Sequence, residues 1–134
     1  MIYIIVLLSM FFCHIIDDFY LQGILAEMKQ KQYWLQYHYK MYKYDYIMAL
    51  VIHAFSWTFM IHIPILTLIL TNHITIPVQL FIVFLINVII HSFIDNMKAN
   101  LKLINLVEDQ LIHFSQIIIT WITYMCIIVP QLEV

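Results

Sequence analysis

The chain has no arginine and little charge of either sign. Charged residues make up 10% of its 134 residues, all six positive side chains are lysines, and the formal net charge is −2. Any basic function must therefore rest on lysine. Because no strongly basic field is present, the sequence does not favour nucleic acid as a partner.

Thiol groups are equally scarce. The two cysteines, Cys13 and Cys126, lie inside apolar runs and have no C-x-x-C spacing. We interpret them as small buried hydrophobic side chains rather than as metal ligands. The N-terminal apolar run has neither a basic start nor an A-x-A-like site, so we expect no cleaved signal peptide.

Apolar residues, by contrast, are abundant. They make up 64% of the chain, and the mean hydropathy is +0.91, far above that of soluble globular proteins. A chain of this length suggests one domain. The composition predicts an integral membrane protein whose main partner is the lipid bilayer.

Four segments are long and apolar enough to cross a bilayer as helices, which takes about 20 residues each. We therefore predict an all-α four-helix bundle. We expect a kink at Pro64, which neighbouring helices tolerate, and an end of the last helix before Pro130. The short connection after the second segment favours antiparallel packing of the second and third. The predicted spans are residues 2–22, 47–70, 77–97 and 106–129.

The only long connection, residues 23–46, is rich in tyrosine, tryptophan and lysine. This combination is typical of the headgroup zone of a membrane. We predict a helical extension of the first span followed by an interfacial segment. A ligand-binding role for these aromatic side chains is the alternative.

The lysines predict an orientation. All of them lie in the connections after the first and third spans, and none lies at either terminus or between the second and third spans. By the positive-inside rule, we expect the two lysine connections to face the cytoplasm and both termini to face outward. The lysines are Lys29, Lys31, Lys40, Lys43, Lys98 and Lys102.

Three of the spans carry a histidine and an aspartate four residues apart. Four residues correspond to 400° of helix, so each pair lies on one helix face. The order is reversed in the last span, which runs opposite to the first and third, so in all three spans the aspartate lies nearer the cytoplasm. The pairs are His14 with Asp18, His91 with Asp95, and Asp109 with His113.

These groups lie at a common depth, about 9–16 Å from the lysine-rich helix ends at a rise of about 1.5 Å per residue. His53 of the second span falls in the same range, whereas His62 points to the opposite face of that span. Asp17 is off the shared face of its helix, and we interpret it as an interfacial or supporting carboxylate. Gln22 and Gln110 are candidates for hydrogen bonds to the ligands; ordinary polar residues at helix ends are the alternative.

Ionised groups inside a bilayer cost about 2.5–3.5 kcal/mol each, and a divalent cation bound among them offsets that cost. Mixed nitrogen and oxygen ligands suit zinc, manganese or iron. Because the candidates outnumber the four ligands of a structural zinc site, we predict one or two ions; hydrogen-bonded interior pairs without a metal are the alternative. We expect Asn87 to line the deep side of this pocket. Lys98 could neutralise Asp95, bind a phosphate or extend to the interface. The predicted ligands are His14, Asp18, His53, His91, Asp95, Asp109 and His113.

Five stretches of the chain are similar to a known family in their order and spacing. These stretches are HIIDDFYLQ, EMKQK, IHAF, HSFIDNMK and EDQLIH. Through them the chain resembles the domain of unknown function 3307, a family of small bacterial and phage membrane proteins. The resemblance covers most of the chain. It implies a polytopic protein of a bacterial inner membrane or a phage-infected host membrane, with the same seven histidines and aspartates as its characteristic residues. It also implies that Lys29 or Lys31 is the family's lysine after the first motif. It implies no reaction.

Three functions follow from these patterns. The first is a metal-dependent hydrolase that acts at the cytoplasmic leaflet on a lipid-like or phosphate-bearing substrate, with water as the nucleophile; no serine or cysteine nucleophile with a base at fixed spacing is present. The second is a proton or metal-ion transporter, which the nearly pure apolar outer halves of the spans disfavour. The third is a non-enzymatic membrane factor with a structural metal. The oligomeric state stays open. For the hydrolase, the predicted catalytic residues are Asp18, Asp95, Asp109 and Lys98.

Overall fold

The computed structural model describes residues 1–37, 39–76 and 78–132, which contain helices and no strand. Four helices are long and apolar enough to cross a membrane. This confirms the predicted all-α class, and the spans lie close to the predicted ranges; residue 77, the predicted start of the third span, lies outside the described residues. The long helices are α1 (Ile2–Ile16) continued by η1 (Asp17–Leu21), α5 (Asp45–Thr71), α6 (Val78–Asn96) continued by η2 (Met97–Leu101), and α7 (Leu106–Leu132).

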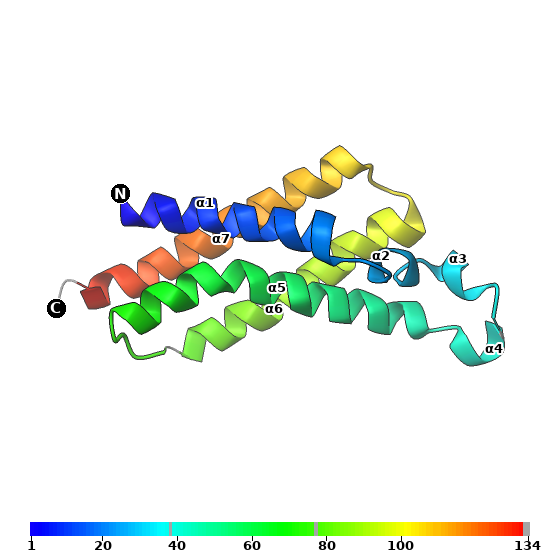
Figure 1. The fold of residues 1–134 in the computed structure, drawn as a ribbon, viewed down its shortest axis with the longest axis horizontal. Helices are drawn as coiled ribbons and strands as arrows, with labels where there is room; N and C mark the ends of the chain where they lie inside the picture. Colours follow the sequence, from blue (N-terminus) through cyan, green and yellow to red (C-terminus); the bar gives the residue numbers. More distant parts are fainter. Residues whose placement is uncertain (38, 77, 133–134) are drawn as a thin grey trace.

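Helix α5 is the most enclosed of the four. It packs most extensively against α6 and α1, and half of its most apolar 18-residue window is buried, against 17% of the corresponding window in α6. Both chain termini lie at one end of the bundle, called here the terminal end (Figure 1). The short helices α2 (Leu25–Met28), α3 (Lys31–Trp34) and α4 (Tyr39–Tyr42) lie at the other end, called here the lysine end.

The bundle carries apolar side chains on its outside and many polar ones inside. Ile4, Leu8 and Phe12 of α1 are each 60–63% exposed, although exposure to water would be costly for such side chains. Histidines and aspartates from the same helices are almost completely buried. This distribution fits a molecule surrounded by lipid, and the chain is an integral membrane protein with four candidate spans.

The predicted helical extension of the first span is wrong. Gly23 follows the end of η1 and has a φ of +50°, a left-handed conformation that glycine adopts without the steric cost of a Cβ atom. The chain therefore turns there, and α2 folds back to contact α5. Beyond it, Trp34 stacks on Tyr42 with ring centroids 5.9 Å apart, so aromatic side chains do gather in this connection.

The two prolines inside long helices do not interrupt them. Pro64 lies within a continuous α5, and Pro130 lies within the last turn of α7, which continues to Leu132 instead of ending at residue 129 as predicted. A proline removes the one hydrogen bond that its N–H would make to the residue four earlier. Pro130 lies so near the end of α7 that almost no backbone hydrogen bonds follow it and could be disturbed.

Candidate metal centre

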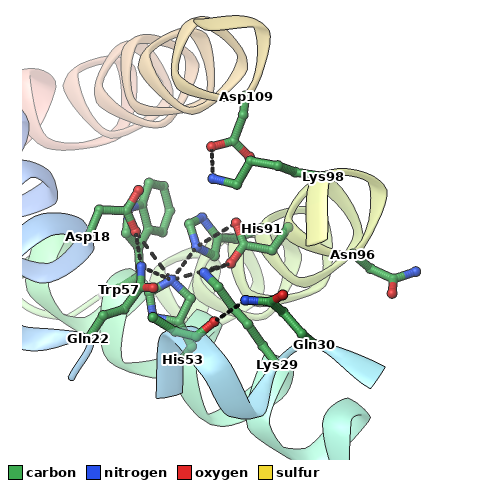
Figure 2. A network of polar contacts seen from close by, with 12 residues as sticks. Asp18, Gln22, Lys29, Gln30, His53, Trp57, His91, Asn96, Lys98 and Asp109 are labelled. Atoms are coloured by element: carbon green, nitrogen blue, oxygen red, sulfur yellow. Dashed lines mark hydrogen bonds and ion pairs between the residues drawn. The ribbon is translucent and has the colours of Figure 1, made fainter. Parts of the chain in front are cut away.

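Histidine and aspartate side chains from all four long helices converge inside the bundle toward the lysine end (Figure 2). They form two groups of three whose donor atoms lie within 4.8 Å of one another, and both groups contain His91. The three histidines are at most 1% exposed. These buried groups could hold a metal ion, as the pattern of pairs predicted. The groups are Asp18, His53 and His91, and His91, Asp95 and His113.

The spacing of the donor atoms suits a small cation. His53 Nε2 lies 3.2 Å from His91 Nε2 and 3.2 Å from Asp18 Oδ1. It also lies 3.4 Å from Asp95 Oδ2, and His113 Nε2 lies 3.4 Å from Asp95 Oδ1. Ligands about 2.0–2.1 Å from one tetrahedral ion lie roughly 3.3–3.4 Å from each other. Within the second group, His91 Nε2 lies 3.8 Å from Asp95 Oδ1, so a bound ion would draw some of these side chains closer together.

Two of the seven predicted ligands, His14 and Asp109, adjoin the two groups without belonging to them. His14 uses both ring nitrogens elsewhere: Nδ1 accepts a 2.7 Å hydrogen bond from Trp57 Nε1, and Nε2 lies 3.1 Å from Gln110 Oε1. Asp109 forms an ion pair with Lys98. Helical spacing predicted that these residues share a face with the others, but the partners that occupy them come from other helices.

Gln22 and Gln110 contact the carboxylates, which favours the first of the two interpretations of these residues. Gln22 Nε2 donates to Asp18 Oδ1 at 3.1 Å and lies 3.2 Å from His53 Nε2. Gln110 Nε2 lies 3.1 Å from both Asp18 Oδ2 and Asp109 Oδ2. Such contacts fix the orientation of side chains that bind metals.

Asp17 lies behind His53 rather than at the membrane interface. It is 1% exposed, its Oδ1 accepts a 2.7 Å hydrogen bond from Ser56 Oγ, and its Oδ2 lies 3.7 Å from His53 Nδ1. The interfacial interpretation is therefore wrong and the supporting one is favoured. Residues 17–21 are π-helical, and this wider turn allows both Asp17 and Asp18 to face the bundle interior.

A lysine outside the predicted site residues reaches into the centre. Lys29 is 5% exposed, and its Nζ lies 2.6 Å from Asp95 Oδ2. Lys31, the alternative in the resemblance, instead lies over the ring of Tyr46, 4.9 Å from its centroid. Lys98 pairs with Asp109 and not with Asp95. The turn at residue 23 is what returns Lys29 to the bundle.

Trp57 is a second residue that the sequence analysis missed. Its ring stacks on that of His91, with centroids 4.1 Å apart and 22° between the planes. His91 also stacks on His113 at 4.1 Å, and the rings of Trp57 and His113 lie 5.5 Å apart. Trp57 follows His53 by four residues, so the same helical spacing that paired the histidines and aspartates could have placed it on this face.

A cavity of about 280 Å³ opens beside the centre. The end of η1, α2, η2 and the start of α7 enclose it. Its polar lining includes residues that contact the two ligand groups directly, so the centre is reached from this side. These polar lining residues include Asp18, Gln22, Lys29, Lys98, Lys102 and Gln110.

The interior of the terminal half is not as apolar as we predicted. Asn87 Nδ2 donates to Thr120 Oγ1 at 3.0 Å, and Asn87 Oδ1 accepts from Gln116 Nε2 at 2.8 Å. Asn87 thus belongs to a separate network, and the prediction that it lines the deep side of the pocket is not supported by its contacts. A few polar residues per helix suffice for such a network, because each faces inward to avoid lipid.

His62 belongs to another polar contact of the terminal half. Its Nδ1 lies 2.6 Å from Thr58 O, and its Nε2 lies 2.9 Å from Tyr124 Oη. His62 lies on a different face of α5 from His53, as predicted, and it is nevertheless buried, with 1% of its surface exposed. Because α5 is surrounded by three other helices, opposite faces of this helix can both be buried.

The fold and the centre together define a polytopic membrane protein whose buried histidines and aspartates could hold a metal ion. No protein-family model, curated protein or solved structure matches the chain. The resemblance to the domain of unknown function 3307 therefore stays a prediction.

Proposed function

We propose that the protein is a metal-dependent membrane hydrolase that acts at the cytoplasmic leaflet on a lipid-like or phosphate-bearing substrate. The observation that carries this proposal is the convergence of five histidine and aspartate side chains beside a lysine-lined cavity. Charged groups in the bilayer interior are rare and mark functional sites. Here they come from four helices and meet at one point.

The charges of the centre favour a divalent cation. The centre contains four aspartates and two lysines. Lys29 pairs with Asp95 and Lys98 pairs with Asp109, whereas Asp17 and Asp18 contact His53. With neutral imidazoles, which metal binding requires, two negative charges remain, and one divalent ion balances them. Nitrogen and oxygen donors suit zinc first, and manganese or iron as well. Two groups that share His91 offer room for one or two ions.

The chain's own residues divide the remaining work. A bound ion would act as a Lewis acid and make water a better nucleophile. Asp18 and Asp95 hold positions in the ligand groups. Asp109 lies outside them, and its buried Oδ1 lies 3.5 Å from His113 Nε2, so a carboxylate stands beside the ligands, which suits a proton acceptor. Lys98, which pairs with Asp109, would stabilise a phosphate or leaving group.

The lysine end is proposed to face the cytoplasm. All six lysines lie in the connections at this end or at the helix ends beside it, and lysine-rich loops are retained on the cytoplasmic side. Both termini lie at the opposite end (Figure 1) and would face outward.

The test combines metal analysis with an activity assay on protein purified in detergent. We expect copurified transition metal, and we expect zinc to restore hydrolysis of a panel of alkyl and diacyl phosphate esters to metal-stripped protein. Asp109→Asn should keep the ion and lose roughly 10²- to 10⁴-fold in rate, the range of a lost proton acceptor. Asp45→Asn is the matched control, because Asp45 lies in the first turn of α5, outside the centre.

Two results would contradict the proposal. Wild-type protein without transition metal would remove its basis. Bound metal without turnover of any ester would indicate the structural role instead, because the ion would then only hold the bundle together.

A transporter is the second candidate, favoured by the buried Asn87, Gln116 and Thr120 on the terminal side of the centre. Against it, Ile65, Ile69 and other apolar side chains fill the bundle beyond them. Metal or proton flux into liposomes that is lost in His91→Ala would select this function.

A further inference from the structure

The cavity beside the centre combines positive charge with an apolar rim. Lys29, at the end of α2, and Lys98, in η2, extend toward the centre from different walls (Figure 2). Phe19 and Leu106 also line the cavity, and they are 55% and 56% exposed. The opening therefore presents ammonium groups next to surfaces that contact hydrocarbon.

Each of the two inner lysines is paired with a carboxylate, and one of these carboxylates belongs to a ligand group. Lys29 contacts Asp95, which belongs to a ligand group, and Lys98 contacts Asp109. If an ion is bound as in the proposed function, on which this step rests, that ion neutralises the Asp95 carboxylate in place of Lys29. The ammonium group of Lys29 is then free to contact another anion at the inner end of the cavity.

The third lysine is already available. Lys102 lines the cavity, is exposed, and makes no ion pair within the described part of the chain. It ends η2 with a φ of +55°, a left-handed conformation that favours glycine. A lysine at this position adds a positive charge to the cavity, although a glycine would adopt this backbone conformation with less strain.

We propose that this cavity binds the phosphate group of a phosphate ester, with Lys29, Lys98 and Lys102 as its cationic contacts. Asp18 also lines the cavity and Lys98 stays paired with Asp109, so the ammonium groups of Lys29 and Lys102 provide most of the attraction for a compact anion. The apolar rim at Phe19 and Leu106 favours an ester that carries a hydrocarbon chain. The same phosphate chemistry could come from a soluble ester, and the experiment separates the two sources.

The experiment measures binding to zinc-loaded protein in dodecyl maltoside by calorimetry. One arm uses n-dodecyl phosphate and the other inorganic phosphate. We expect saturable binding of dodecyl phosphate at least about tenfold tighter than that of inorganic phosphate, because its chain contacts the rim. Equal affinities would support the phosphate site and assign it to a soluble source. No saturable binding in either arm would overturn the proposal.

Variants separate recognition from folding. Lys102→Gly removes one ammonium group and relieves the left-handed backbone, so it should fold normally and weaken dodecyl phosphate binding roughly 3- to 10-fold. Lys40→Gln makes the same change in charge in α4, outside the cavity, and should bind like wild type. Equal loss in both variants would overturn the site, because it would indicate only a general effect of net charge.

The same samples distinguish this proposal from the proposed function. Zinc content is measured before each titration. Full zinc occupancy without phosphate binding overturns the cavity proposal and leaves the metal centre intact. Failure to bind zinc overturns the proposed function itself.

Discussion

The two halves of the bundle both bury histidine, but they satisfy it in different ways. In the terminal half, His62 has a partner at each ring nitrogen, Thr58 O and Tyr124 Oη. In the lysine half, the Nδ1 atoms of His91 and His113 are buried without a hydrogen-bond partner among the described residues. Their Nε2 atoms face carboxylates or another imidazole.

This difference separates a structural histidine from a candidate ligand. A buried polar group with partners on both sides is stable as it stands. A cluster in which carboxylates and imidazole nitrogens face one another is stabilised by positive charge, which Lys29 supplies to Asp95 and which a bound cation could also supply. His91 also contacts the rings of Trp57 and His113, each 4.1 Å away, so packing holds its ring in one orientation.

The largest expected effect is on metal content. His91→Ala removes the residue that both ligand groups share, so the purified protein should lose most of its bound transition metal, a fall of at least about tenfold by mass spectrometry. His62→Ala makes the same substitution in the terminal half and should retain the metal. Equal metal contents in the two variants would show that the comparison between the halves is wrong.

The buried ion pair of the lysine half should show the next largest effect. In metal-free protein, Asp95→Asn leaves Lys29 buried without its counter-charge, which should lower the free energy of unfolding by about 3–5 kcal/mol. Adding Lys29→Met should restore much of this stability, because no uncompensated charge then remains. Unfolding in mixed micelles, followed by circular dichroism, measures the cycle. Additive losses would indicate that the two side chains do not interact.

The neutral network of the terminal half should be worth less. Asn87→Leu removes the amide that bonds Gln116 and Thr120 and should cost about 1–3 kcal/mol of unfolding free energy, with metal content unchanged. Thr123→Val is the control, because the one partner of the Thr123 hydroxyl among the described residues is the Ile119 carbonyl of its own helix. Loss of metal in Asn87→Leu would instead show that metal binding depends on the terminal half as well.

Much of the architecture could be predicted from the chain alone. Runs of about 20 apolar residues identify spans because backbone polar groups must pair internally in lipid. The spacing of His91 from Asp95, and its reversal in Asp109 and His113, placed these residues on helix faces at one depth. The structure brings His91, Asp95 and His113 together with Asp18 and His53, and leaves Asp109 beside them.

Other residues could not be predicted because their positions depend on more than one element. Lys29 reaches Asp95 only after the chain reverses at Gly23. Asp17 is buried in the π-helical stretch of residues 17–21, where it accepts a hydrogen bond from Ser56 of α5. Neither position can be predicted from the helical period of 3.6 residues.

The sequence by itself determined the class of protein, the four spans and the shared depth of the histidines and aspartates. These follow from hydrophobicity and helical repeat, which are local properties of the chain. Only the tertiary structure decided which of the seven candidates converge, that His14 is occupied by Trp57 and Gln110, and that Asp109 is paired with Lys98. The reason is physical: a hydrogen bond or ion pair between helices depends on their packing, and the partners here are up to 96 residues apart.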